Sequence, residues 1–320
     1  MKKNVLLAIG EALNDFIPDK AGCDFSDVSA FLPCVGGAPA NVCGAFSKLG
    51  GRAKMITQLG NDPFGHKITR ELSGYGIDTS CISYTNQANT ALAFVSLGTD
   101  GNRTFSFYRK PSADMLMTAE QIEKKWFDEA FVLHFCSVSL GNFPMRDAHK
   151  RAIEFAKASD TLISFDPNLR FPLWENKEEL KEAVTHFLPQ ADIVKISDEE
   201  LEFITGTNQI ENAVLSLFDR GVRLVIYTCG KKGAYAFTRT ESVFSKGFTV
   251  NAVDTTGAGD GFIGAFLWKL YKNQITVQNL DAVTKDVLQE SLDFANRFCA
   301  ISVQHQGAIV SYPDIEKMEN

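Results

Sequence analysis

The chain has 320 residues, of which 45% are hydrophobic and 22% are charged, so it can bury a large core in one α/β domain, with or without a small appendage. Its formal net charge is −7 and no stretch concentrates lysine or arginine, which argues against a nucleic-acid partner. The seven cysteines are scattered without C-x-x-C spacing, and the five histidines lack metal-ligand spacing, so neither a zinc site nor a disulfide framework is expected.

The predicted elements begin with the apolar run Val5–Ile9, which is too short for a signal-peptide core or a membrane span, so we expect a cytoplasmic protein with no membrane partner. Further β-rich runs are Lys54–Gln58, Phe131–Phe135, Leu162–Asp166, Ile193–Ile196 and Leu224–Thr228. Amphipathic stretches lie between them at Ala40–Leu49, Pro144–Ala158 and Asn212–Asp219. This alternation predicts a doubly wound α/β fold whose mostly parallel sheet is flanked by helices, as one domain over residues 1–320.

Two regions, approximately residues 13–35 and 88–110, break this alternation. In the second, Thr90–Leu97 and Arg103–Tyr108 flank Gly98-Thr99-Asp100-Gly101, which predicts a hairpin with an Asp-Gly turn. Strands of this kind within a parallel core need a sheet of their own, so we interpret both regions as a small β-sheet lid. The alternative is that they extend the edge of the main sheet.

The most informative segment is a small-residue turn, Asp254-Thr255-Thr256-Gly257-Ala258-Gly259-Asp260. A β-like run, Phe248–Val253, leads into it, and apolar residues at helical spacing follow from Phe262 to Leu270. The turn is thus predicted at a helix N-terminus, where unpaired N–H groups and the helix dipole favour an anion. Gly257, Ala258 and Gly259 would form an anion hole for charge that develops in group transfer.

Asp260 would repel a resting phosphate at the mouth of this turn. A carboxylate is useful there if a hydroxyl must lose its proton while it attacks a phosphorus held nearby, so we predict that Asp260 is the general base of a phosphoryl transfer. The alternative is ordinary stabilisation of a helix N-terminus by Asp260, which does not account for the rest of the string.

Two further strings match nucleotide-binding motifs only in part. The string Gly259-Asp260-Gly261-Phe262-Ile263-Gly264 matches G-x-G-x-x-G, but it would place an aspartate inside a pyrophosphate turn and no apolar strand ends at Asp281, so an NAD-binding dehydrogenase is a weak alternative. Gly230-Lys231 is followed by Lys232 rather than Ser or Thr, and there is no Walker A motif.

Because of this turn, the chain resembles the PfkB or ribokinase-like family of carbohydrate kinases, and within it the bacterial fructokinase branch. Gly36-Gly37-Ala38-Pro39-Ala40-Asn41-Val42 is similar to the N-terminal glycine signature of the family, and residues 58–65, Gln-Leu-Gly-Asn-Asp-Pro-Phe-Gly, are similar to its companion string. The string Asp254–Asp260 matches the C-terminal signature. Two signatures in the correct order, about 200 residues apart, are far more specific than either alone.

The resemblance implies a sugar site that is covered by the lid. Its substrate-binding residues would be Asp15, Gly36, Gly37, Asn41, Ala91, Phe107, Arg170 and Asp260, with Phe105 as a further lid residue. Arg170 would clamp the sugar and the transferred phosphoryl group, because its string Asp166-Pro167-Asn168-Leu169-Arg170 follows a strand at the edge where open α/β sheets bind ligands. Turn or cap hydrogen bonds are the alternative role for Asp15 and Asn41, and packing is the alternative for the lid aromatics.

The resemblance also implies ATP and Mg²⁺ as cofactors. The cofactor-binding residues would be Lys195, Glu200, Thr228, Gly230, Gly233, Gly257, Gly259 and Asn296. Glu200 would organise magnesium through water, with an exposed first-turn helix acid as the alternative, while Ser197 stands where the family has asparagine. A potassium ion is a further expectation, with the site residues Asp254, Thr256, Gly307 and Ser311.

The predicted function is transfer of the γ-phosphoryl group of MgATP to a hydroxyl of a sugar, with D-fructose preferred. A 2-keto-3-deoxygluconate kinase, a ribokinase and a nucleoside kinase remain open alternatives within the family. A non-catalytic sugar-binding regulator is the alternative of another class. An edge strand of the lid can pair with a second subunit, so a homodimer through the lid is one assembly that the sequence allows.

Overall fold

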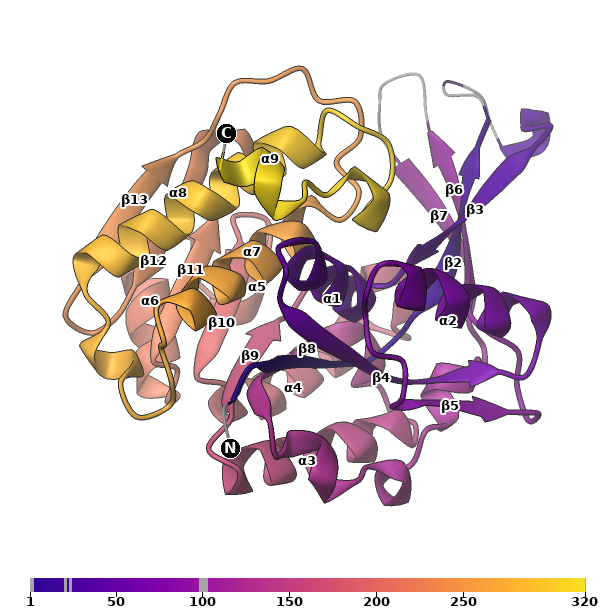
Figure 1. Ribbon diagram of the computed structural model, residues 1–320, viewed down its shortest axis with the longest axis horizontal. Coiled ribbons are helices and arrows are strands. Elements are labelled where there is room, and N and C mark those ends of the chain that lie inside the picture. The colour runs from indigo at the N-terminus through magenta and orange to yellow at the C-terminus, as the bar shows by residue number, and fades with distance from the viewer. Residues whose placement is uncertain (1–2, 20–21, 23–24, 98–102, 320) are drawn as a thin grey trace.

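The computed structural model describes residues 3–19, 22, 25–97 and 103–319, without the side chains at 96–97 and 103–105. Its main sheet has nine strands in the order β13-β12-β11-β10-β9-β8-β1-β4-β5, and a second sheet has four strands in the order β3-β2-β6-β7. Figure 1 shows the second sheet projecting away from one side of the main sheet.

The main sheet is parallel from β5 to β11, and only β12 and β13 run antiparallel to their neighbours. The strands are β1 Val5–Ile9, β4 Arg52–Gly60, β5 Ile82–Thr85, β8 Ala130–Cys136, β9 Leu162–Asp166, β10 Ile193–Ser197, β11 Leu224–Thr228, β12 Gly233–Phe237 and β13 Ser242–Lys246. The α-helices are α1 Ala38–Lys48, α2 Pro63–Gly74, α3 Met145–Ala158, α4 Lys177–Phe187, α5 Leu201–Thr205, α6 Ile210–Asp219, α7 Ala258–Lys272, α8 Lys285–Ser302 and α9 Ile315–Glu319. The predicted fold class is confirmed.

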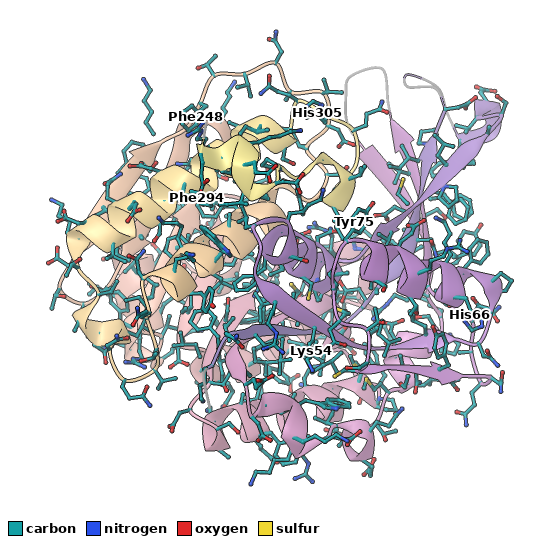
Figure 2. All side chains as sticks on the ribbon, viewed as in Figure 1. Lys54, His66, Tyr75, Phe248, Phe294 and His305 are labelled. Atoms are coloured by element: carbon teal, nitrogen blue, oxygen red, sulfur yellow. The ribbon has the colours of Figure 1, made fainter. Side chains whose placement is uncertain are left out.

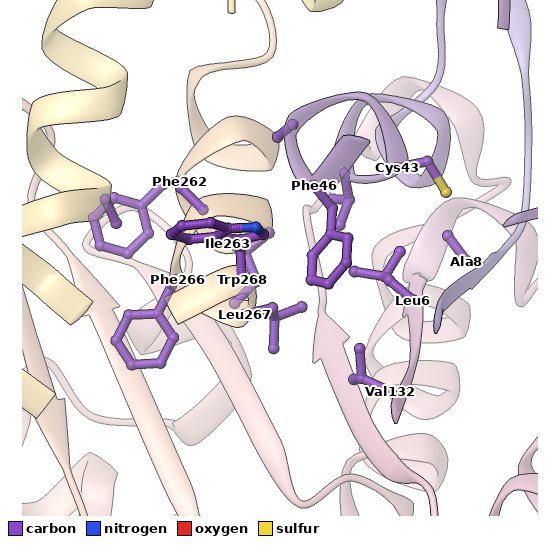
Figure 3. Close-up of a cluster of buried hydrophobic side chains, with 14 of the residues drawn as sticks. Leu6, Ala8, Cys43, Phe46, Val132, Phe262, Ile263, Phe266, Leu267 and Trp268 are labelled. Carbon is purple, nitrogen blue, oxygen red and sulfur yellow. The ribbon is translucent and has the colours of Figure 1, made fainter. Parts of the chain in front are cut away.

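The core has two parts because side chains alternate across each strand. Leu6 and Ala8 of β1 belong to a cluster with α1, α7 and α8, whereas Val5, Leu7 and Ile9 belong to a cluster with α3, α4 and α6. Figure 3 shows the first cluster, in which Phe46 of α1 lies between Leu6 of β1 and the α7 side chains. Over the described residues, none of the helices is both long enough and apolar enough to cross a bilayer.

The second sheet is separate from the main sheet, so the alternative that its strands extend the main sheet is wrong. Its strands are β2 Leu13–Pro18, β3 Phe31–Gly36, β6 Leu92–Leu97 and β7 Arg103–Tyr108. Strand β2 pairs antiparallel with β3 and parallel with β6, and β6 pairs antiparallel with β7 as a hairpin requires. The predicted Asp-Gly turn at 98–101 and the side chain of Phe105 lie outside the described part of the chain.

One predicted strand is wrong. The apolar run Phe248–Val253 is not a strand, because the last strand of the sheet, β13, already ends at Lys246 and the chain then leaves the sheet edge. Phe248 is 47% exposed and lies at the surface in Figure 2, and Val253 is also exposed. Amides of Val253 and Asp254 instead donate to the Val303 carbonyl after α8, which leads the chain to the start of α7.

Candidate active site

Asp260 lies in the first turn of α7, beside the carboxyl ends of the central strands, and is only 7% exposed. Two amide side chains from distant elements hold its carboxylate. Asn41 of α1 donates from Nδ2 to Oδ2 at 2.9 Å, and Asn168, which follows β9, donates from Nδ2 to Oδ1 at 3.5 Å. Each carboxylate oxygen retains lone pairs, so Asp260 can still accept a proton from a third group.

The electrostatics of Asp260 suit a base. Burial raises the pKa of its carboxyl, while the Asn41 hydrogen bond and the positive charges of Arg170 and Lys195 lower it. Burial is the larger effect, so the pKa of the carboxyl lies above its ordinary value, and the nearby donors oppose that rise.

The turn before α7 requires glycine for physical reasons. Gly257 has φ of 70°, and a Cβ there would lie 2.6 Å from Tyr312 Oη, whose hydroxyl donates to the Gly257 carbonyl at 2.7 Å. A Cβ at Gly259 would lie 3.2 Å from Lys195 Nζ. The Ala258 amide donates to the Thr255 carbonyl, so the free N–H groups of this helix start belong to the residues that follow it.

A buried ion pair lies directly beside this helix start. Lys195 of β10 donates from Nζ to Oδ2 of Asp166, the last residue of β9, at 2.9 Å, and their side chains are 7% and 1% exposed. The charges of Asp166, Glu200 and Asp260 raise the pKa of Lys195 against the effect of burial, so the ammonium group is retained. Burial raises the pKa of Asp166, and Lys195 opposes that rise. A fixed positive charge thus faces the glycine turn.

Glu200 is placed by backbone amides. Its carboxylate accepts from Leu169 N at 2.7 Å and from Ser197 N at 2.9 Å, and Lys195 together with these bonds lowers its pKa against the effect of burial. Glu200 is 7% exposed, which does not fit the alternative of an exposed helix acid. Each oxygen keeps a lone pair for a hard cation or its water shell, so the residue fits a magnesium contact through water.

Arg170 lies near Asp260 but is exposed, with Nη1 donating to the Leu169 carbonyl at 3.1 Å. Its charge reaches Asp260 and lowers the pKa of that carboxyl. The guanidinium therefore lies within electrostatic range of Asp260, while most of its N–H donors remain available to a ligand.

The residues predicted for sugar binding fall at the base of the second sheet. Asp15 of β2 lies against Gly36, where a Cβ would be 2.1 Å from Asp15 Oδ2, so glycine is needed for this carboxylate to lie there. Gly37, with φ of 103°, precedes Asn41 by one helical turn. Ala91 is buried in a cluster to which Phe107 of β7 packs, which brings these two predicted residues together on one face of the sheet.

The other residues predicted for the nucleotide, away from the α7 turn, fall into two places. Asn296 of α8 donates to the carbonyl and the Oγ of Ser245 at 3.1 and 2.8 Å, and a Cβ at Gly233 would lie 2.0 Å from the same Ser245 carbonyl. Thr228 ends β11 and Gly230 starts the short turn after it, with φ of 53° and open space where a side chain would project. The two groups are joined through β12.

Asp254 organises the residues predicted for potassium. One of its oxygens accepts from Thr256 N and Thr256 Oγ1 at 2.7 and 2.6 Å, and the other accepts from Gly307 N at 2.9 Å. The Ser311 hydroxyl contacts Ser302 Oγ at 2.7 Å and the Ala308 carbonyl at 2.8 Å. Across the described residues there is no group of three or more His, Cys, Asp or Glu side chains arranged to hold a metal ion.

Asn168 and Asp166 were not predicted as site residues, although they belong to the same string as Arg170. Asn168 has φ of 44°, a conformation that asparagine tolerates better than most residues, and this turns its amide toward Asp260. A signal was present, because polar residues directly after a buried strand lie at the ligand-binding edge of an open sheet.

The chain is similar to known carbohydrate kinases over nearly its whole length. The model of the pfkB family carbohydrate kinases matches residues 3–315. Fructokinase-1 of Zea mays is 42% identical over 312 residues, which cover 97% of this chain and 95% of that protein.

Two solved structures have the same overall shape. Fructokinase from Xylella fastidiosa with bound ATP superposes with a TM-score of 0.91 at 32% identity, covering 99% of this chain and 97% of the other. A double mutant of fructokinase from Vibrio cholerae O395, in a form with fructose, ADP and potassium bound, superposes with a TM-score of 0.87 at 32% identity, covering 99% and 98%.

Proposed function

The chain belongs to the pfkB family of carbohydrate kinases, and we propose that it transfers the γ-phosphoryl group of ATP to a hydroxyl of D-fructose. The observation that carries the proposal is the position of Asp260, a desolvated carboxylate at a helix N-terminus with two amide donors on it. A group held in this way is ready to take a proton from an attacking hydroxyl, and the helix start offers amides to the phosphoryl group.

In the proposed mechanism, the sugar hydroxyl lies against Asp260 and attacks the phosphorus in line with the leaving oxygen of ADP. Asp260 takes the hydroxyl proton as the new O–P bond forms and the bond to the ADP oxygen breaks. The N–H groups of the first turn of α7, Lys195 and Arg170 stabilise the charge that spreads over the phosphoryl oxygens. Asn41 would help to hold the sugar hydroxyl against Asp260, because its Oδ1 is buried with no partner among the described residues and can accept from a hydroxyl.

We also propose that the second sheet acts as a lid. Asp15, Gly36 and Gly37 would hold sugar hydroxyls, and Ala91 and Phe107 would cover the apolar face of the ring. Closure would exclude water from the phosphoryl group.

Magnesium and potassium are part of the proposal. Magnesium would be held by Glu200 through water and would supply positive charge against the phosphate groups of ATP. Potassium would lie beside the glycine turn, near Asp254, Thr256, Gly307 and Ser311. The Vibrio cholerae fructokinase with bound potassium supports the choice of ion.

The experiment that tests the function is ATP consumption with Mg²⁺, with and without K⁺, across fructose, ribose, 2-keto-3-deoxygluconate, glucose, mannose and adenosine. We expect turnover with fructose and a product heavier by one phosphate. Turnover with another member alone would keep the mechanism and replace the substrate. Sugar binding without turnover would support a regulator instead, and reduction of NAD without use of ATP would support a dehydrogenase.

The assembly and location of the protein complete the proposal. Strands β3 and β7 are the edges of the second sheet, and they expose Leu32 at 66% and Tyr108 at 64%, so we propose a homodimer through this sheet. Light scattering of the parent and of Leu32→Glu tests it, because a dimer through this edge should dissociate in the variant. The described cysteines are free, in keeping with a reducing cytoplasmic location that cell fractionation can test.

A further inference from the structure

The chain passes between the main sheet and the second sheet four times. The passages are β1 to β2 through Glu11, β3 to α1 through Gly37, β5 to β6 through Thr90, and β7 to the following 3-10 turn through Arg109. Any movement of the second sheet relative to the site must bend the chain at these passages.

A buried charge network ties the last of these passages to the core. Arg109 is 4% exposed and directly follows β7. Its Nε and Nη2 donate to Oδ2 of Asp114 at 3.1 and 2.5 Å, its Nη1 donates to the Val138 carbonyl at 3.3 Å, and Nη2 also contacts Ser139 Oγ at 3.4 Å. Ser112 Oγ donates to the second oxygen of Asp114 at 2.5 Å.

The same network reaches the first two passages through Ser139. The Ser139 hydroxyl donates to Glu11 Oε2 at 2.9 Å, and Glu11 Oε1 accepts from Ala38 N at 3.3 Å. Ala38 is the first residue of α1, whose N-cap residue Gly37 supplies no side chain, so the Glu11 carboxylate acts as the cap. One turn further on, Asn41 of this helix holds Asp260.

The remaining passage, from β5 to β6 through Thr90, is held by a separate set of hydrogen bonds. Asp62, at the start of α2, accepts from Thr90 N at 2.8 Å and from Thr90 Oγ1 at 3.0 Å, and Thr90 Oγ1 in turn accepts from Gly60 N at 3.0 Å. All four passages are therefore fixed by buried or half-buried polar contacts rather than by free loops.

We propose that Glu11, Ser139, Arg109 and Asp114 form the root of the second sheet. These positioning residues couple the position of this sheet, relative to the main sheet, to the position of Asn41 and so to Asp260. The three charged groups and the hydroxyl between them make one connected unit, and such units change arrangement together rather than residue by residue. The effect of the root on sugar phosphorylation rests on the proposed sugar kinase function, whereas its effect on the mobility of the second sheet does not.

Ser139→Ala is the sharpest test, because it removes the hydroxyl that joins Glu11 to Arg109 and leaves every charge in place. We expect amides of β3 and β7 to exchange hydrogen about tenfold faster in the ligand-free variant, with amides of β9 and β10 within about twofold of the parent. We also expect KM for fructose to rise by about tenfold while KM for ATP stays within about twofold.

Ser291→Ala is the matched control, because Ser291 is a fully buried serine of α8 whose Oγ donates to Val287 O, away from the root. This variant should leave both the hydrogen exchange of the β3 and β7 amides and the KM for fructose unchanged. The isosteric Glu11→Gln is a second variant, which removes one charge but keeps an acceptor for Ala38 N, and it should also loosen β3 and β7.

Two results would overturn the proposal. One is exchange in β3 and β7 of Ser139→Ala within about twofold of the parent, and the other is an equal acceleration in β9 and β10, which would make the network an ordinary core contact. A parent protein that does not phosphorylate fructose would refute the proposed function alone, because the exchange measurement in the ligand-free protein does not depend on the substrate.

Discussion

Replacement of Asp260 by Asn isolates the proton transfer from the rest of the site. The amide oxygen can still accept from Asn41 Nδ2, which bonds the carboxylate at 2.9 Å, and only the longer 3.5 Å contact with Asn168 is lost. The variant should therefore fold. Because burial raises the pKa of Asp260, the folded protein works against its ionisation, and a neutral isostere removes that cost. Asp260→Asn should be at least as stable as the parent in thermal unfolding.

Its turnover should fall steeply. A positioned general base contributes about 10²–10⁴-fold, which corresponds to about 3–5 kcal/mol of transition-state stabilisation. We expect kcat of Asp260→Asn to decrease by that factor in an ATP-consumption assay with fructose, with KM for fructose within about fivefold, since ground-state hydrogen bonds are kept.

Asp192→Asn is the matched control. Asp192 accepts from Ile163 N at 2.9 Å and Arg223 Nη1 at 3.3 Å, immediately before β10 begins and so at the opposite ends of the strands from the site. Its kcat should stay within about twofold of the parent. A kcat of Asp260→Asn within tenfold of the parent would refute the role of Asp260 as base.

Asn41→Ala removes a donor that lowers the pKa of Asp260, so the acidic limb of the kcat/KM profile should move to higher pH, by about one to two units for a hydrogen bond to a charged group; an unmoved limb would contradict this. Burial lowers the pKa of His149 from 6.5 to about 4, so its contribution to stability is present above pH 6.5 and is lost as the pH falls toward 4. In urea unfolding, the free energy of unfolding should fall from pH 7 to about pH 5 in both proteins, but by about 2 kcal/mol less in His149→Phe than in the parent. An equal fall in both would show that His149 is not the titrating group. Gly257→Ala should destabilise the fold by more than Gly206→Ala in the same assay, because both have positive φ but only Gly257 has atoms within 4 Å of an added Cβ.

Much of the fold could be predicted because its signals are local. Leu162–Asp166 and Leu224–Thr228 are strands with the predicted bounds, since a short apolar run between helical stretches has few other solutions in an α/β protein. Phe248–Val253 is also short, with two valines and a threonine, and is not a strand. Whether such a run pairs depends on a neighbouring strand edge, and after β13 the chain leaves that edge, which no local pattern encodes.

The candidate site was predictable where one short string carries both geometry and chemistry. The glycine turn and Asp260 are contiguous, so small residues, a helix start and a carboxylate can be recognised together. The partners of Asp260 are 219 and 92 residues away in sequence, at Asn41 and Asn168. Asn41 was found only through family resemblance, and Asn168 was missed, because amides are common and only the folded sheet places this one against the base.

The root of the second sheet shows that contacts between charged residues far apart in sequence are also hidden from local patterns. Glu11 lies between β1 and β2 and Arg109 directly follows β7, and a sequence shows each as an ordinary surface charge. Folding buries both to 4% exposure or less and joins them through one serine hydroxyl. Burial of charge is costly unless every partner is in place, so these residues restrict the second sheet to positions in which the network is complete. In those positions the Glu11 carboxylate caps α1, and Asn41 reaches Asp260 from the first turn of that helix. The contacts that hold the second sheet, the proposed lid, thus also place the Asn41 amide on Asp260, the proposed base.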